Sequence, residues 1–126
     1  MALPRWMDVT LKLEWAGLVL LLVVMYHLAG GSWLLFAILI LAPDLAMLGY
    51  LAGPRIGAIA YNSVHIAVGP VLLFLVWLWN GNLLIMEIAT IWAIHIAFDR
   101  ALGYGLKLSS FQDTHIGRIG RDRADL

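Results

Sequence analysis

The sequence predicts an all-α integral membrane protein with four transmembrane helices. Of its 126 residues, 63% are hydrophobic and 13% are charged, whereas a soluble domain carries about 45–50% apolar and about 25% charged residues. The charges also gather at the two ends of the chain, because between residues 16 and 98 the only charged side chains are Asp44, Arg55 and Glu87. These observations exclude a single water-soluble globule.

Four apolar segments reach the length of about 20 residues that a spanning helix needs. They cover about residues 13–29, 33–51, 56–79 and 83–104. The second contains Pro43 and the third contains Pro70. The short turns at residues 30–32 (Gly-Gly-Ser) and 80–82 (Asn-Gly-Asn) predict two antiparallel hairpins. Residues 1–126 therefore form one transmembrane domain, with a polar tail from residue 107 onwards.

The basic residues predict the orientation. Short loops rich in lysine and arginine stay on the cytoplasmic side. All eight basic residues lie on one side of the predicted bundle: Arg5, Lys12, Arg55, Arg100, Lys107, Arg118, Arg121 and Arg123. Both termini and the loop before the third helix are therefore predicted to be cytoplasmic. Eight acidic residues balance the eight basic ones, so the net charge of zero does not suggest a nucleic-acid partner.

Three ionisable side chains are predicted to share one layer inside the membrane. Counted at about 1.5 Å per residue from the cytoplasmic helix ends, Asp44, His65 and His95 each lie about 10–13 Å deep. Asp99 follows His95 by one helical turn, and Glu14 lies at about the depth of Asp99. An ionisable residue at the centre of a spanning helix costs about 2.5–3.5 kcal/mol, so this layer is a functional-site hypothesis.

Three interpretations of the polar layer are open. The first is a metal site in which Asp44, His65 and His95 bind one zinc, iron or manganese ion and a water occupies an open position. The chain has no cysteine, so thiolate ligands are excluded. The second is a path for protons or ions through the membrane. The third is a network of hydrogen bonds that only fixes the packing of the helices.

Each interpretation predicts a different function, and whether the protein is an enzyme stays open. The metal site favours a hydrolase acting on a lipid or another amphiphile. In that case Asp99 or Glu14 would be the general base, and Arg100 or His115 would stabilise developing negative charge. The alternatives are a small transport or ligand-binding protein coupled to protons or ions, and a purely structural network. The small interior of a chain of this length also makes a homodimer plausible.

Other polar residues flank the layer. Tyr61 and Asn62 lie about one turn before His65 and could orient its imidazole ring. In the tail, the run FQDTHIGRIGR places Asp113 and His115 within reach of the cytoplasmic mouth of the layer. A free tail is the alternative.

Four strings resemble a bacterial membrane family known as domain of unknown function 4260. They are APDLAMLGYLAGPRIGA, YNSVH, IWAIHIAFDRALGYGLK and FQDTHIGRIGR. Ala46 stands where the family often has serine, which argues against a hydroxyl nucleophile there. The resemblance implies a small four-helix protein of the bacterial inner membrane but no activity. Its motif residues map onto Glu14, Asp44, Tyr50, Asn62, His65, His95, Asp99, Arg100, Asp113 and His115.

Overall fold

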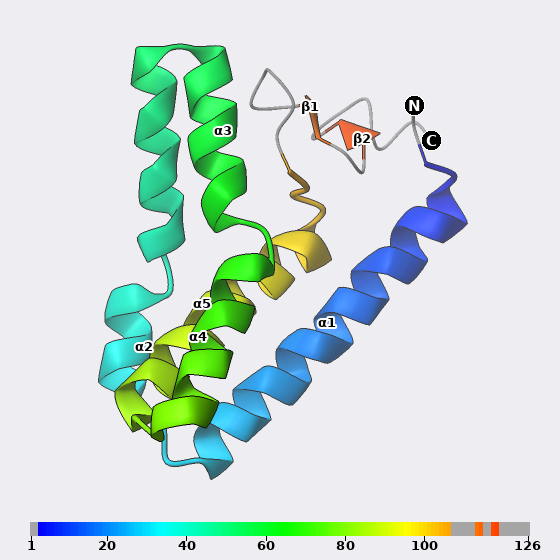
Figure 1. Cartoon of the computed structure of the whole chain (residues 1–126). Coiled ribbons are helices and arrows are strands. Elements are labelled where there is room, and N and C mark those ends of the chain that lie inside the picture. Colours follow the sequence, from blue (N-terminus) through cyan, green and yellow to red (C-terminus); the bar gives the residue numbers. More distant parts are fainter. Residues whose placement is uncertain (1–2, 107–112, 115–116, 119–126) are drawn as a thin grey trace.

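The protein is a bundle of helices (Figure 1). The computed structural model describes residues 3–106, 113–114 and 117–118. Its helices are α1 (Arg5–Leu28), α2 (Trp33–Leu39), the 3-10 helix η1 (Ala42–Ala52), α3 (Pro54–Val64), α4 (Val68–Asn80) and α5 (Leu83–Leu102). Two short strands, β1 (Asp113–Thr114) and β2 (Gly117–Arg118), pair antiparallel. The all-α fold class predicted from the sequence is confirmed.

Three stretches are long and apolar enough to cross a membrane: Arg5–Leu28, Trp33–Ala52 and Pro54–Asn80. The sequence predicted four such stretches. The fourth, α5, is as long as the second, but it contains Glu87, Asp99 and Arg100. It also holds most of the buried residues of the described chain, so it is shielded by the other helices. The hairpin pairing and the sides on which the termini lie stay predictions.

Helix α1 begins at Arg5 rather than near residue 13. Pro4 directly precedes it, at a position where the missing N–H group costs the helix no hydrogen bond. The added turns are polar and hold an ion pair one turn apart, in which Nζ of Lys12 lies 2.9 Å from Oδ2 of Asp8. The polar start of the chain therefore extends the first helix beyond its apolar segment.

The second and third predicted helices are each broken, and each break lies about four residues before a proline. Helix α2 ends at Leu39, four residues before Pro43, and the gap between α3 and α4 includes Ile66, four residues before Pro70. A proline ring collides with the carbonyl group four residues earlier and cannot donate a hydrogen bond. The two prolines thus explain both interruptions.

Helix α5 is the centre of the packing. It contacts α1 and α4 extensively and α2 over a smaller area, while η1 packs against α3. Figure 1 shows α5 behind α4, and α1 runs along the side of α5 that α4 does not cover. The buried residues of α5 include Ala89, Ile91, Ile94, His95 and Ala97. Residues from distant parts of the chain therefore meet along this helix.

The contact between η1 and α3 depends on glycine. A Cβ atom on Gly57 would collide with the ring of Tyr50, and one on Gly49 would lie 2.9 Å from Cβ of Ala60. The two helices therefore approach so closely that the ring of Tyr50 lies directly over the backbone of α3. Small residues at helix contacts permit this approach in membrane proteins.

We expect Gly57→Ala to lower the free energy of unfolding by about 1–3 kcal/mol, because the added methyl group overfills the contact with Tyr50. Gly17→Ala is the matched control on α1, where an added Cβ meets no atom within 4 Å. It should leave stability unchanged or raise it by up to about 1 kcal/mol, since alanine is the better helix former. Thermal unfolding followed by circular dichroism in one detergent tests both. Equal midpoints for the two variants would contradict the close contact.

Candidate metal centre

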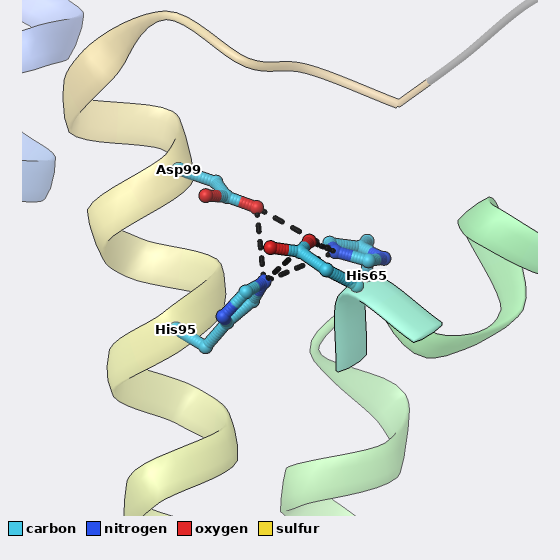
Figure 2. Close-up of side chains that lie close together, drawn as sticks. His65, His95 and Asp99 are labelled. Atoms are coloured by element: carbon cyan, nitrogen blue, oxygen red, sulfur yellow. Dashed lines mark hydrogen bonds and ion pairs between the residues drawn. The ribbon is translucent and has the colours of Figure 1, made fainter. Parts of the chain in front are cut away.

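Four side chains from three elements converge at one point beside α5. Asp44 lies in the first turn of η1, His65 caps the C-terminal end of α3, and His95 and Asp99 lie one turn apart on α5. One ligand atom from each lies within 4.8 Å of all the others. Figure 2 shows His65 facing His95 and Asp99 across the space between the helices. The cluster could hold a metal ion.

The distances within the cluster are short and nearly equal. Nε2 of His65 lies 3.2 Å from Nε2 of His95. Oδ1 of Asp44 lies 3.2 Å from the first of these nitrogens and 3.1 Å from the second. Oδ2 of Asp99 lies 3.5 Å and 3.2 Å from the same two atoms. Each Nε2 atom therefore faces the other imidazole and both carboxylates.

The other nitrogen of each ring fixes where the proton sits. Nδ1 of His65 lies 2.8 Å from the carbonyl oxygen of Tyr61, and Nδ1 of His95 is hydrogen-bonded to the carbonyl oxygen of Ile40. A carbonyl oxygen only accepts, so both Nδ1 atoms carry a proton and Nε2 of a neutral ring is a bare acceptor. Two bare nitrogens facing two carboxylate oxygens need a cation or extra protons between them.

The spacing fits a tetrahedral metal site. Zinc binds nitrogen and oxygen at about 2.0–2.2 Å, which places neighbouring ligands of a tetrahedron about 3.3–3.6 Å apart. Five of the six distances between the four ligand atoms run from 3.1 to 3.5 Å, and all six are within 4.8 Å. Hydrogen bonds from Nδ1 to backbone carbonyls are also the usual outer support of metal-binding histidines. Iron and manganese accept the same ligand types.

Burial makes a cation more favourable still. The side chain of His65 is 0% exposed, that of His95 4% and that of Asp99 15%, whereas Asp44 is 37% exposed. With neutral histidines the cluster carries two negative charges, which are costly to remove from water unless they are paired. A divalent ion neutralises this charge. Asp44 is the ligand that a molecule from outside can approach.

Comparison with known proteins identifies the family. The chain matches the family described as domain of unknown function (DUF4260) over residues 8–119. It belongs to the DUF4260 family. The resemblance seen in the sequence is thereby confirmed, and all four cluster residues lie inside the matched region. No curated protein and no solved structure shows significant similarity to the chain. The description of DUF4260 assigns no activity, so the site itself is the evidence for function.

Side chains of α5 bind the backbone groups that the two helix breaks expose in this DUF4260 chain. Nδ1 of His95 binds the carbonyl oxygen of Ile40 at the first break. At the second break, Nε1 of Trp92 donates to the carbonyl oxygen of Val64 at 2.7 Å, and Nη2 of Arg100 donates to that of His65 at 2.8 Å. These bonds hold η1 and the end of α3 against α5, which positions Asp44 and His65.

Trp92 was absent from the residues singled out in the sequence. Its indole N–H lies in an apolar helix, where it requires an acceptor, but the sequence does not reveal that a break in another helix supplies one. Arg100 was expected to stabilise negative charge. The structure shows two of its N–H groups donating to backbone carbonyls, those of His65 and Tyr104, each at 2.8 Å. Its role on this evidence is to hold the end of α3.

Tyr61 and Tyr50 lie on the α3 side of the cluster. The ring of Tyr61 is stacked on the imidazole of His65, with centroids 3.7 Å apart and planes 8° apart. Tyr50 packs on α3 at Gly57, and Asn62 is half-buried on α3, three residues before His65. Tyr61 therefore has the direct contact with a cluster side chain that an orienting residue needs.

The remaining predicted residues lie elsewhere or outside the described part. Glu14 is exposed on α1 and is not a member of the cluster. Asp113 lies in β1, where only the backbone is described, and it pairs with Arg118 of β2. His115 lies outside the described residues. The arrangement of the tail over the cluster therefore stays a prediction.

We expect stoichiometric zinc, iron or manganese in the purified protein, and loss of that metal in Asp44→Asn and in a His65→Ala/His95→Ala double variant, because each change removes ligands. His27→Ala is the matched control, since His27 is exposed at the end of α1. Elemental analysis of each protein in detergent measures the ratio. Metal retained by both ligand variants would contradict a centre at this cluster.

Trp92→Phe should lower the free energy of unfolding by about 1–3 kcal/mol, because the carbonyl oxygen of Val64 loses its partner in an apolar environment. Trp79→Phe makes the same chemical change at a ring that is 85% exposed, and it should be close to neutral. Unfolding midpoints measured in one detergent compare the two variants. If Trp79→Phe is the more damaging change, the role assigned to Trp92 is wrong.

Proposed function

We propose that this protein is a membrane-embedded, metal-dependent hydrolase that acts on an amphiphilic substrate. One observation carries the proposal. The four ligand atoms of Asp44, His65, His95 and Asp99 converge beside an apolar cavity of about 480 Å³, and three of these residues form part of its wall. A reactive polar group at the end of an apolar cavity is suited to a molecule with one polar and one apolar end.

The cluster residues divide into two roles in this proposal. His65, His95 and Asp44 bind the ion. When bound, a divalent ion acidifies a water molecule and polarises the substrate oxygen that develops negative charge. Asp99 lies beside these ligands, with Oδ2 only 3.2 Å from Nε2 of His95. In this proposal it accepts the proton of the attacking water. Its place inside the cluster favours Asp99 over the exposed Glu14 as the general base.

The surroundings support a membrane location. Three stretches are long and apolar enough to span a bilayer, and many large apolar side chains of α1, η1 and α4 are exposed, among them Leu28, Leu51 and Leu78. Lipid is the environment that stabilises such a surface. With the basic residues on the cytoplasmic side, we assign the protein to the bacterial inner membrane.

Asp99→Asn should keep the metal and lose hydrolysis by about 100-fold or more, because it removes the proton acceptor and leaves three ligands in place. Asp44→Asn should lose both. The assay measures release of 4-nitrophenol from 4-nitrophenyl laurate and from 4-nitrophenyl dodecyl phosphate, with metal content determined on the same samples.

The two readouts separate the parts of the proposal. Metal lost in Asp99→Asn would make Asp99 a ligand rather than the base. Wild-type protein that contains metal but cleaves neither probe would contradict the hydrolase and leave the metal centre standing. Protein without metal would favour a proton path or a packing network instead.

A further inference from the structure

A cavity of about 480 Å³ lies between α1, α2, η1 and α5. Val19 and Val23 of α1, Phe36 of α2, and Phe98 and Leu102 of α5 form its apolar walls. Its size falls within the range of about 300–1,000 Å³ that is usual for small-molecule sites. An apolar cavity of this kind binds hydrocarbon rather than a polar solute.

The polar part of the cavity wall belongs to the cluster. Asp44, His95 and Asp99 line the cavity, whereas His65 lies outside it. Asp44 is also the most exposed of the four cluster side chains, at 37%. A molecule in the cavity therefore reaches the cluster from the side of Asp44. A second apolar pocket, of about 200 Å³ between Pro43 and Trp92, touches no cluster residue.

The cavity lies where α1 and the α2–η1 stretch diverge (Figure 1). Tyr26 of α1 packs on Trp33 and Phe36 of α2 beside their connecting turn. Within the described residues, α1 and α2 both pack on α5, while α1 has few contacts with η1. Both α1 and the α2–η1 stretch are apolar enough to span a bilayer. If both stretches span the bilayer, the space between α1 and η1 faces hydrocarbon, which gives an alkyl chain a route from the lipid into the cavity.

We propose that this cavity binds the alkyl chain of the substrate, which enters sideways from the bilayer between α1 and η1 and places its polar group against Asp44 at the metal centre. The inference rests on the proposed metal-dependent function. It defines the substrate class as amphiphiles with an alkyl chain next to the bond that is cleaved.

Straight-chain hydroxamic acids provide the test, because one end binds a metal ion and the other is an alkyl chain. The protein is loaded with cobalt(II) in lipid nanodiscs, and binding is followed by the change in cobalt absorption. Val23→Trp fills the cavity, and Val24→Trp is the matched control because Val24 is 44% exposed and does not line it. Val19→Phe is a second cavity-filling variant, in case Val23→Trp disturbs the packing of α1.

We expect the cavity variants to weaken binding of dodecanohydroxamic acid at least tenfold relative to Val24→Trp, while the affinity for acetohydroxamic acid and the cobalt content stay within twofold of the wild type. Comparison at a fixed chain length cancels partitioning into the lipid. Unchanged dodecanohydroxamic acid binding in both cavity variants, with cobalt bound, would overturn the inference and leave the metal centre intact. Failure of the wild type to bind cobalt would overturn the proposed function and this inference together.

Discussion

The structure depends on the hydrogen bonds that α5 makes to the backbone of two broken helices. A helix interrupted inside a membrane exposes carbonyl groups that lipid cannot satisfy, so such interruptions persist only where protein groups replace the missing partners. His95, Trp92 and Arg100 supply these partners to Ile40, Val64 and His65. Because all three donors lie on one helix, a single element holds both interruptions in place.

This constraint joins the fold to the candidate metal centre. His95 uses one ring nitrogen to hold the break before η1 and the other to face Asp44. Arg100 holds the carbonyl oxygen of His65, whose own ring lies in the cluster. The hydrogen bonds that satisfy the carbonyl groups at the two helix breaks therefore also position the cluster side chains. A substitution on α5 disturbs stability and the site at once, which is why matched variants away from α5 are the informative controls.

The sequence predicted which side chains meet better than how the chain brings them together. Counting along straight helices placed Asp44, His65 and His95 in one layer, and the structure brings them together. The second and third predicted helices are interrupted near Asp44 and His65, whereas the prediction assumed continuous helices. The sequence showed Pro43 and Pro70, but it did not show where the freed carbonyls would point, because that direction depends on how α5 packs.

Asp99 and Trp92 illustrate the same limit. Asp99 was expected near the layer as a base one turn from His95, and it lies within the cluster itself. Trp92 stands three residues before His95 and gave no signal in the sequence, because its partner is a carbonyl group that a continuous third helix would have satisfied. Helical spacing predicts which residues share a face of one helix. It does not predict which other element is broken opposite that face.

The charge of the cluster must be balanced, because its surroundings are apolar. Two ionised carboxylates and two acceptor nitrogens repel one another at 3.1–3.5 Å unless a cation or protons lie between them. In the proposed metal centre a divalent ion would replace this repulsion by attraction to Asp44 of η1, His65 of α3 and His95 of α5. Metal binding and the closed arrangement would then be linked equilibria, in which each favours the other. The ion would connect three elements as well as serve as the reactive group beside the cavity.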